Sequence, residues 1–230
     1  MIDVCFTYSE LESPHGKLAV IIDTLRATTT IITAIDNGAS FVIPVESIED
    51  ALRQREIHWN AILGGERKGI KIEGFDIGNS PSEYSRDLVS HNAIIITTTN
   101  GTRAIKSAAG CNKIILAALI NSKAAANYIK SIKEDIVIVC SGTAGKFTME
   151  DAYTAGCIIS KTGRKDLTDS AYAAKYLYDG LKRDPKILYN ACYHLNKLID
   201  MGFSEDVVYS LKEDTTETIP YYANDKIIRG

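Results

Sequence analysis

The stretch from Leu18 to Asn37 constrains the fold of this chain more than any other. Its first residues, Leu18 to Ile22, form an apolar and largely β-branched run, which is typical of a strand buried on both faces. An apolar pattern at helical spacing begins at Ile31 and ends near Gly38. Between the strand and the helix lie a carboxylate, a guanidinium and three hydroxyls: Asp23, Arg26, Thr28, Thr29 and Thr30. Hydroxyls and free N–H groups at a helix N-terminus can hold an anion.

Two further turns repeat this arrangement. The run Ala93 to Thr98 leads into Thr99-Asn100-Gly101-Thr102-Arg103, and the run Ile136 to Cys140 leads into Ser141-Gly142-Thr143-Ala144-Gly145-Lys146. In open α/β sheets, ligands bind where the carboxyl ends of parallel strands meet. We therefore predict an α/β fold in which these turns form one pocket. The first two turns are also similar in sequence, which is compatible with an internal duplication.

Length and composition limit the class of protein. A chain of 230 residues fits one α/β domain, or two lobes of about 1–90 and 91–230 with the site between them. The net charge of −3 argues against nucleic acid as a partner, and no apolar run reaches the roughly 20 residues of a membrane span. The five cysteines form no metal-binding or CxxC spacing, which favours a reduced, cytoplasmic location. The oligomeric state stays open, a homo-oligomer included.

The segment from Gly64 to Tyr84 is expected to be a long functional loop. It contains five glycines, and apolar residues such as Ile72 and Phe75 can anchor it. Ser80-Pro81-Ser82-Glu83 predicts a helix start, and so a second seat for an anion.

From Asp166 onward, helical patterns dominate. We expect helices at Asp169 to Leu181, Pro185 to Met201 and Ser204 to Leu211, which form a layer over the sheet without a chemical role. A final strand or extended tail is expected at Thr218 to Ile228. The four histidines lie outside the turns, so surface or capping roles are expected for them.

Two common phosphatase chemistries fit poorly. Cysteine-dependent phosphatases need an arginine six residues beyond the nucleophile, whereas Lys146 follows Cys140 at that spacing. Aspartyl-phosphate phosphatases need a second aspartate two residues after the first, and Leu25 follows Asp23 there. The predicted edge instead gathers both signs of charge: Arg26, Arg67, Lys68, Lys71, Arg103 and Lys146 beside Asp23, Glu66, Asp76, Glu150 and Asp151. This mixture suits a polyanionic substrate, a hard divalent cation and water as the attacking group.

Four motifs in chain order carry a resemblance to a known family. They are Asp-Thr-Leu-Arg-Ala-Thr-Thr-Thr (23–30), Gly-Glu-Arg…Gly-Phe-Asp-Ile-Gly-Asn-Ser-Pro-Ser-Glu-Tyr (65–84), Thr-Thr-Thr-Asn-Gly-Thr-Arg-Ala (97–104) and Cys-Ser-Gly-Thr-Ala-Gly…Glu-Asp (140–151). This set resembles the 2-phosphosulfolactate phosphatase family over roughly the first two-thirds of the chain. The resemblance implies a three-layer α/β/α fold with a largely parallel or mixed sheet, Mg²⁺ dependence, and hydrolysis of 2-phosphosulfolactate on the way to coenzyme M.

The resemblance also implies roles for individual residues. Catalytic roles fall to Asp23, Arg26, Arg67, Asn100, Arg103 and Ser141, the arginines gripping anionic groups. Magnesium ligands would come from Glu66, Asp76, Glu150 and Asp151. Substrate contacts would come from Thr28, Thr29, Thr30, Lys71, Asn79, Ser80, Thr99, Gly101, Thr102, Gly142, Thr143 and Lys146. Two alternatives stay open: a phosphatase of another small acidic phosphoester, and a non-catalytic protein that binds phosphorylated metabolites.

Overall fold

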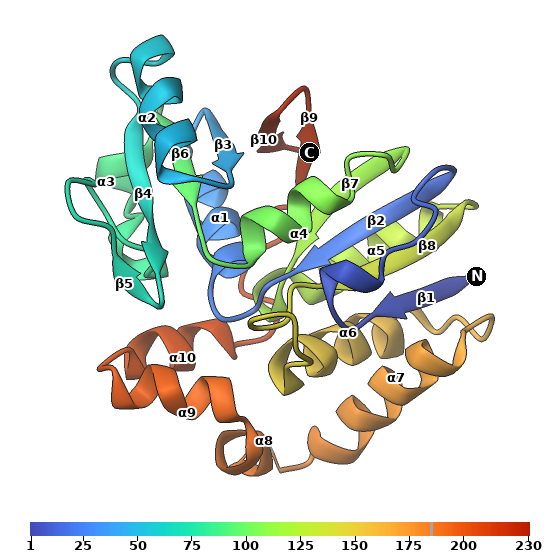
Figure 1. Ribbon diagram of the computed structural model, residues 1–230. Coiled ribbons are helices and arrows are strands. Elements are labelled where there is room, and N and C mark those ends of the chain that lie inside the picture. Colours follow the sequence, from blue (N-terminus) through green and yellow to red (C-terminus); the bar gives the residue numbers. More distant parts are fainter. Residues whose placement is uncertain (185) are drawn as a thin grey trace.

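In residues 1–184 and 186–230, which the computed structural model describes, ten strands form one mixed sheet with helices packed around it (Figure 1). The strands are β1 (Ile2–Cys5), β2 (Lys17–Ile22), β3 (Phe41–Val45), β4 (Ile62–Arg67), β5 (Ile70–Lys71), β6 (Ala93–Thr97), β7 (Lys113–Ala117), β8 (Asp135–Cys140), β9 (Pro220–Ala223) and β10 (Lys226–Arg229). The α-helices are α1 (Ala27–Asp36), α2 (Ile48–Ile57), α3 (Arg86–Val89), α4 (Gly101–Ser107), α5 (Ser122–Ser131), α6 (Met149–Thr162), α7 (Asp169–Leu181), α8 (Lys186–Ala191), α9 (Tyr193–Asp200) and α10 (Ser204–Ser210). Short 3₁₀ turns occur at Tyr8–Glu10, Pro81–Glu83 and Leu119–Asn121.

The sheet consists of two parallel halves joined by an antiparallel hairpin. Its strand order is β1-β8-β2-β7-β9-β10-β3-β6-β4-β5. Strands β1, β8, β2 and β7 run parallel to one another, and so do β3, β6 and β4, while the short strand β5 pairs antiparallel with β4 at the edge. The hairpin β9–β10 pairs antiparallel with β7 on one side and with β3 on the other. The hairpin therefore makes a single sheet out of two.

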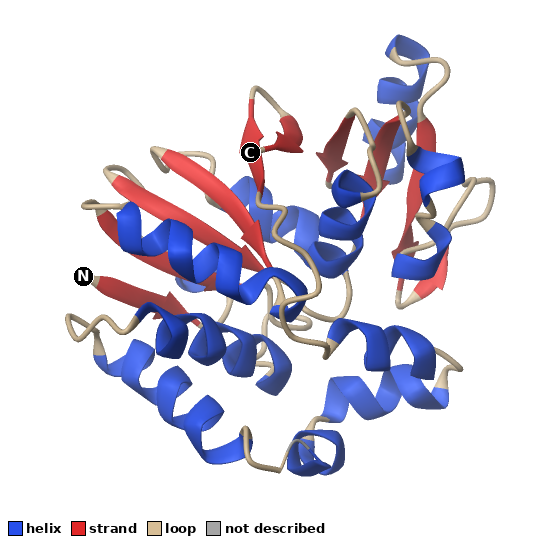
Figure 2. Ribbon diagram, turned by 180° about the vertical axis from the view of Figure 1, so that it is seen from behind, coloured by secondary structure: helices blue, strands red, loops and turns tan. Residues whose placement is uncertain are grey.

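Helices α1 and α4 lie between the two halves, as the view from behind shows (Figure 2). Ile31 and Ile35 of α1 share one buried cluster with Ile21 of β2 and with Ile94 and Ile96 of β6. The outer face of the first half is covered by α5, α6 and α7, and that of the second half by α2 and the segment around Phe75. The predicted three-layer α/β/α fold is confirmed.

The last helices occupy a different place from the one expected. Helix α7 packs on α6 and β1, but α8, α9 and α10 contribute to a separate cluster with Leu25, Leu119 and Tyr153. They lie across the carboxyl ends of the strands rather than over a face of the sheet (Figure 1). In the described residues, no helix combines the length and the apolar character that a bilayer span requires.

Several predicted boundaries need correction. The helix expected from Pro185 to Met201 is two helices separated at Cys192, and Pro185 itself lies outside the described residues. The helix start at Ser80 produces only the 3₁₀ turn Pro81–Glu83, and the expected loop after Gly64 begins as a continuation of β4. Strand β6 lies between β3 and β4 in the sheet, and the division into two lobes near residue 90 stays a prediction. The internal duplication stays a prediction.

Candidate active site

Asp23 lies where β2 ends and α1 begins, and it is almost completely buried. The turn is closed locally, since the backbone N–H of Asp23 donates to the Thr28 hydroxyl and this hydroxyl donates to the Asp23 carbonyl. The Ala27 N–H donates to Asp23 Oδ1 at 3.2 Å. Gly101 of α4 packs so closely that a Cβ there would lie 2.7 Å from Asp23 Oδ2, so only glycine fits. Burial raises the pKa of the Asp23 carboxyl, and the positive charge of His194 only partly offsets this.

Glu66, the second buried carboxylate, projects from β4. Its Oε1 accepts the backbone N–H of Thr99 at 2.7 Å, and its Oε2 accepts the N–H of Gly69 at 2.6 Å and the Thr99 hydroxyl at 3.1 Å. These bonds connect the β4–β5 hairpin to the turn between β6 and α4. Glu66 is thus fixed in orientation by groups on both sides of it.

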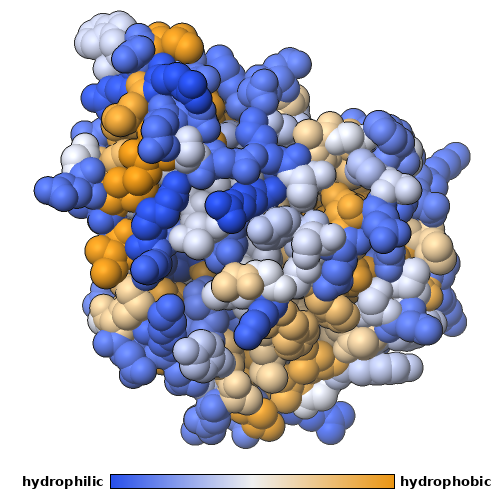
Figure 3. Space-filling model, in the orientation of Figure 1, coloured by the Kyte–Doolittle hydropathy of each residue, from blue (hydrophilic) through white to orange (hydrophobic). Residues whose placement is uncertain are grey.

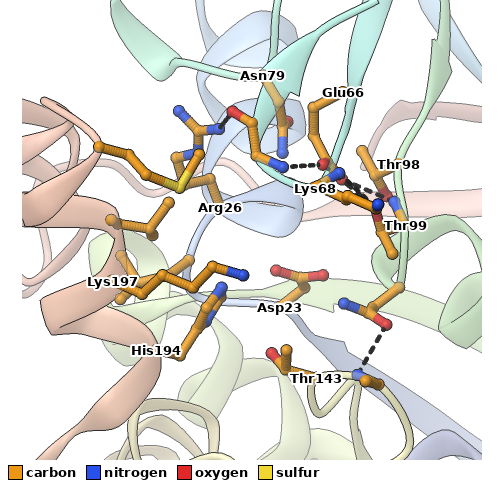
Figure 4. A pocket seen from close by; sticks show the side chains of 16 residues that line it. Asp23, Arg26, Glu66, Lys68, Asn79, Thr98, Thr99, Thr143, His194 and Lys197 are labelled. Atoms are coloured by element: carbon orange, nitrogen blue, oxygen red, sulfur yellow. Dashed lines mark hydrogen bonds between the residues drawn. The ribbon is translucent and has the colours of Figure 1, made fainter.

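Asp23 and Glu66 line the same cavity, which has a volume of about 190 Å³ (Figure 4). The turns after β2, β4, β6 and β8 all reach it, as the sequence predicts. Lys68 and Thr99 lie on one side, Asn100 also lines the cavity, and Thr143 comes from the turn after β8. Asn79 is buried, lines the cavity, and has no hydrogen-bond partner for its Oδ1 among the described residues. Hydrophilic side chains cover much of this face of the molecule (Figure 3).

Helix α9 supplies the remaining wall, which corrects two expectations from the sequence. His194 and Lys197 point into the cavity toward Asp23, and Leu198 and Met201 also line it (Figure 4). The expectation that all four histidines lie outside the site is therefore wrong for His194. The spacing 194, 197, 198 and 201 places these residues on one helical face. Two polar residues on this otherwise apolar face are the sequence feature that could have indicated a role for them in the site.

Glu150 lies behind His194 instead of facing the cavity. It is 1% exposed, its Oε1 pairs with His194 Nδ1 at 2.7 Å, and its Oε2 accepts the Cys192 thiol at 2.8 Å. Burial lowers the pKa of His194, but the hydrogen bond to Glu150 and the nearby carboxylates outweigh burial and raise it. Because a carboxylate only accepts, Nδ1 carries a proton and Nε2 is left for the cavity.

Asp151 joins the turns after β2 and β8 beneath the cavity. Its carboxylate accepts the Thr24 N–H at 2.9 Å, the Ser141 hydroxyl at 3.1 Å and the Gly142 N–H at 3.2 Å. Burial raises the pKa of Asp151, and the charges of Glu150 and Asp23 add to this effect. Asp151 and Ser141 thus connect the two turns and do not line the cavity.

Arg26 lines the cavity with its charge already paired. Its guanidinium donates to Asp206 of α10 at 2.6 Å and to the Gly69 carbonyl at 2.8 Å, and it lies 4.1 Å above the Phe203 ring. Ser80 donates its hydroxyl to the same Asp206. Arg26 and Ser80 therefore belong to a buried network that attaches α10 to the site.

Other predicted residues lie away from the cavity. Arg67 donates to Thr97 and to the carbonyls of Glu46 and Glu66, and Asp76 pairs with Arg55. Three further side chains are exposed and do not line it: Lys71, Arg103 and Lys146. Four threonine hydroxyls are used by backbone carbonyls: Thr28, Thr29, Thr30 and Thr102 donate to Asp23, Thr24, Asn79 and Thr98 respectively. Gly142 has a positive φ of 62° and accommodates the carbonyl of Lys146.

Cys140 does not support a cysteine-based reaction. It is 1% exposed, packs in the cluster under α5 and α6, and is absent from the cavity wall. Burial raises the pKa of its thiol well above the usual value, which disfavours the nucleophilic thiolate.

The carboxylates that line the cavity can be compared with the oxygen ligands that a hard cation such as Mg²⁺ requires. In the described residues, no three His, Cys, Asp or Glu side chains are arranged to hold a metal ion. Mg²⁺, however, is commonly bound by one or two carboxylates together with substrate phosphate and water. Asp23 and Glu66 meet that requirement, and the raised pKa of Asp23 shows a carboxylate that would gain from a cation partner.

Comparison with known proteins places the chain among relatives of similar length. The sequence model described as 2-phosphosulpholactate phosphatase matches residues 5–225. Three proteins named "Probable 2-phosphosulfolactate phosphatase" are similar: one from Clostridium acetobutylicum at 40% identity over 94% of both chains, one from Thermotoga maritima at 41% over 92% of both, and one from Clostridium tetani at 42% over 97% of both. On these matches, the chain belongs to the 2-phosphosulpholactate phosphatase family.

Proposed function

We propose that this protein is a phosphoric monoester hydrolase that converts 2-phosphosulfolactate and water to sulfolactate and phosphate. The observation that carries the proposal is the cavity itself, which is lined by two buried carboxylates, Asp23 and Glu66, and by three cationic or protonatable side chains, Lys68, His194 and Lys197. A compact substrate with phosphate, carboxylate and sulfonate groups matches this number of cationic side chains. The family relatives are named for this activity, which supports the same substrate here. A role on the way to coenzyme M stays a prediction.

We propose Mg²⁺ as the cofactor, held by Asp23 and Glu66. When bound, it would neutralise phosphate charge and lower the pKa of water for attack on phosphorus. Asp76, Glu150 and Asp151 are left out of this proposed set because none of the three lines the cavity.

The chain's own residues position and neutralise the substrate. Lys68 lies beside Glu66, where its ammonium group can hold phosphate oxygens. Hydrolysis breaks the bond between phosphorus and the C2 oxygen, and this oxygen must gain a proton to become the sulfolactate hydroxyl. Catalysis of this type depends mainly on positioning and on charge neutralisation.

Phosphate release tests the proposal. Purified protein is incubated with 2-phosphosulfolactate, with 2-phospholactate and with an aromatic phosphate, in Mg²⁺ or in chelator. We expect release from 2-phosphosulfolactate in Mg²⁺, with a higher kcat/KM than for the other two esters, and loss of at least 100-fold in chelator.

The alternatives give different results in the same assay. Faster release from another small acidic phosphoester would replace the substrate and keep the reaction class. Thermal stabilisation by 2-phosphosulfolactate without phosphate release would indicate a binding protein. Activity that is insensitive to chelator would remove the Mg²⁺ proposal.

A further inference from the structure

The cavity has two chemically different sides, and a substrate with different groups at its two ends can be oriented by them. One side carries Glu66, Lys68 and Thr99 from the β4–β5 hairpin and the turn after β6. The opposite side carries His194 and Lys197 of α9 (Figure 4), and Leu198 of the same helix and Met201, which follows it, also line the cavity. Asp23 lies between the two sides.

We propose that Lys197 determines specificity by binding the acidic group of the substrate that is not transferred, the sulfonate above all. This inference rests on the proposed function. A phosphate held next to Glu66 and Lys68 leaves the rest of a three-carbon acid pointing toward α9. Leu198 and Met201 give that side an apolar wall for the carbon chain, and Lys197 provides the charge at its end.

The other cations near α9 are already engaged. The charge of Arg26 is neutralised by Asp206, with both side chains about 95% or more buried. His194 is held by Glu150 at 2.7 Å. Lys197, by contrast, forms no ion pair within the described residues, although Asp200 lies only three residues away on the same helix. An exposed ammonium group directed into the cavity is therefore available for a sulfonate or carboxylate.

Lys68 gives a matched control, because it is also an exposed lysine that lines the cavity. It lies on the phosphate side, so its loss should affect every phosphoester alike. The decisive quantity is the ratio of kcat/KM for 2-phosphosulfolactate to kcat/KM for 2-phospholactate, which lacks the sulfonate.

We expect Lys197→Met to lower this ratio about 10-fold, the size of one solvent-accessible charged hydrogen bond. Lys68→Met should lower both kcat/KM values and leave the ratio within about twofold. Lys197→Arg, which keeps the charge, should retain most of the discrimination. An unchanged ratio in Lys197→Met would overturn the inference while leaving the phosphatase activity of the wild type intact.

A binding measurement keeps the inference testable if the wild type releases no phosphate from these esters. Sulfolactate, which has no phosphate, and inorganic phosphate are titrated against each protein by calorimetry. Sulfolactate should bind about 10-fold more weakly to Lys197→Met than to the wild type, and inorganic phosphate should weaken in Lys68→Met instead. Equal weakening of both ligands by both variants would contradict separate subsites.

Discussion

The buried carboxylate of Asp23 is expected to favour the binding of a cation and, at the same time, to lower the stability of the ligand-free fold. Its carboxyl is buried at the end of β2, and burial raises its pKa, so the ionised form is costly in the ligand-free protein. Asp23→Asn removes that cost without changing the shape of the side chain. We expect kcat to fall at least 100-fold while the melting temperature rises by a few degrees, roughly 2–4 °C per kcal/mol for a chain of this size. A variant that loses both activity and stability would show that Asp23 mainly supports the fold.

The gain in stability from Asp23→Asn should depend on pH. A carboxyl whose pKa is raised on folding stabilises the native state fully below its unfolded pKa of about 3.9 and loses this contribution as pH rises through the folded pKa. Asparagine does not titrate, so the difference in melting temperature should widen from pH 4 to pH 7 in metal-free buffer. Thermal unfolding of both proteins across that range measures it, and a difference that narrows with rising pH would contradict the assignment.

Local sequence patterns revealed some of the residues that line the cavity and missed others. Asp23 and Glu66 stand in segments whose composition is visible in the sequence, and both line the cavity. Lys71 of β5 and Arg103 of α4 come from segments of similar composition but are exposed and do not line the cavity, because side-chain direction depends on the local backbone and not on composition. His194 and Lys197 lie far from these turns in sequence, so only tertiary packing brings them to the site.

At the scale of elements, the buried pair of Arg26 and Asp206 attaches α10 to the β2–α1 turn. Removing one partner of such a pair leaves an uncompensated buried charge and typically costs about 3–5 kcal/mol. We expect Asp206→Asn and Arg26→Met each to destabilise the protein by that amount. The double variant should be more stable than either single variant, because no lone charge is left. Denaturant unfolding of the four proteins in a double-mutant cycle measures the coupling, and additive losses would contradict it.

Segments with a strong periodic pattern were predicted well, whereas interruptions within such segments were not predicted. Helix Asp169–Leu181 has the bounds that the sequence indicates, and the strand expected at Leu18 to Ile22 begins only one residue earlier, at Lys17. The interruption at Cys192 was missed because the apolar spacing continues through it, while the thiol and His194 both turn toward Glu150. The turn after Ser80 ends at Glu83, and the Ser80 hydroxyl donates to Asp206, a tertiary contact that no local rule contains.

At the scale of the whole molecule, the hairpin β9–β10 holds the two halves of the sheet together. Ile227 of β10 is fully buried in the cluster between the halves, whereas its neighbour Ile228 faces the other side and is partly exposed. Ile227→Ala should cost about 2–4 kcal/mol of unfolding free energy, and Ile228→Ala less than about 1.5 kcal/mol. Urea unfolding checks this pair, and equal effects would contradict the proposed role of Ile227.

The topology was the least predictable property. Runs of β-branched residues predict the strands of each parallel half. For the segment from Thr218 to Ile228, the sequence predicts only a strand or an extended tail. Its place between β7 and β3 depends on which strand edges remain unpaired after both halves form. That information is spread over the whole chain and is absent from the segment itself.

The position of the hairpin has a consequence for how the protein matures during synthesis. Residues 220–229 follow every other strand in the chain, and yet they occupy the middle of the sheet. A nascent polypeptide can form each parallel half early, but it cannot close the gap between them until this last hairpin has left the ribosome. The sheet that carries Asp23 and Glu66, one in each half, is therefore complete only once residues 220–229 have been made.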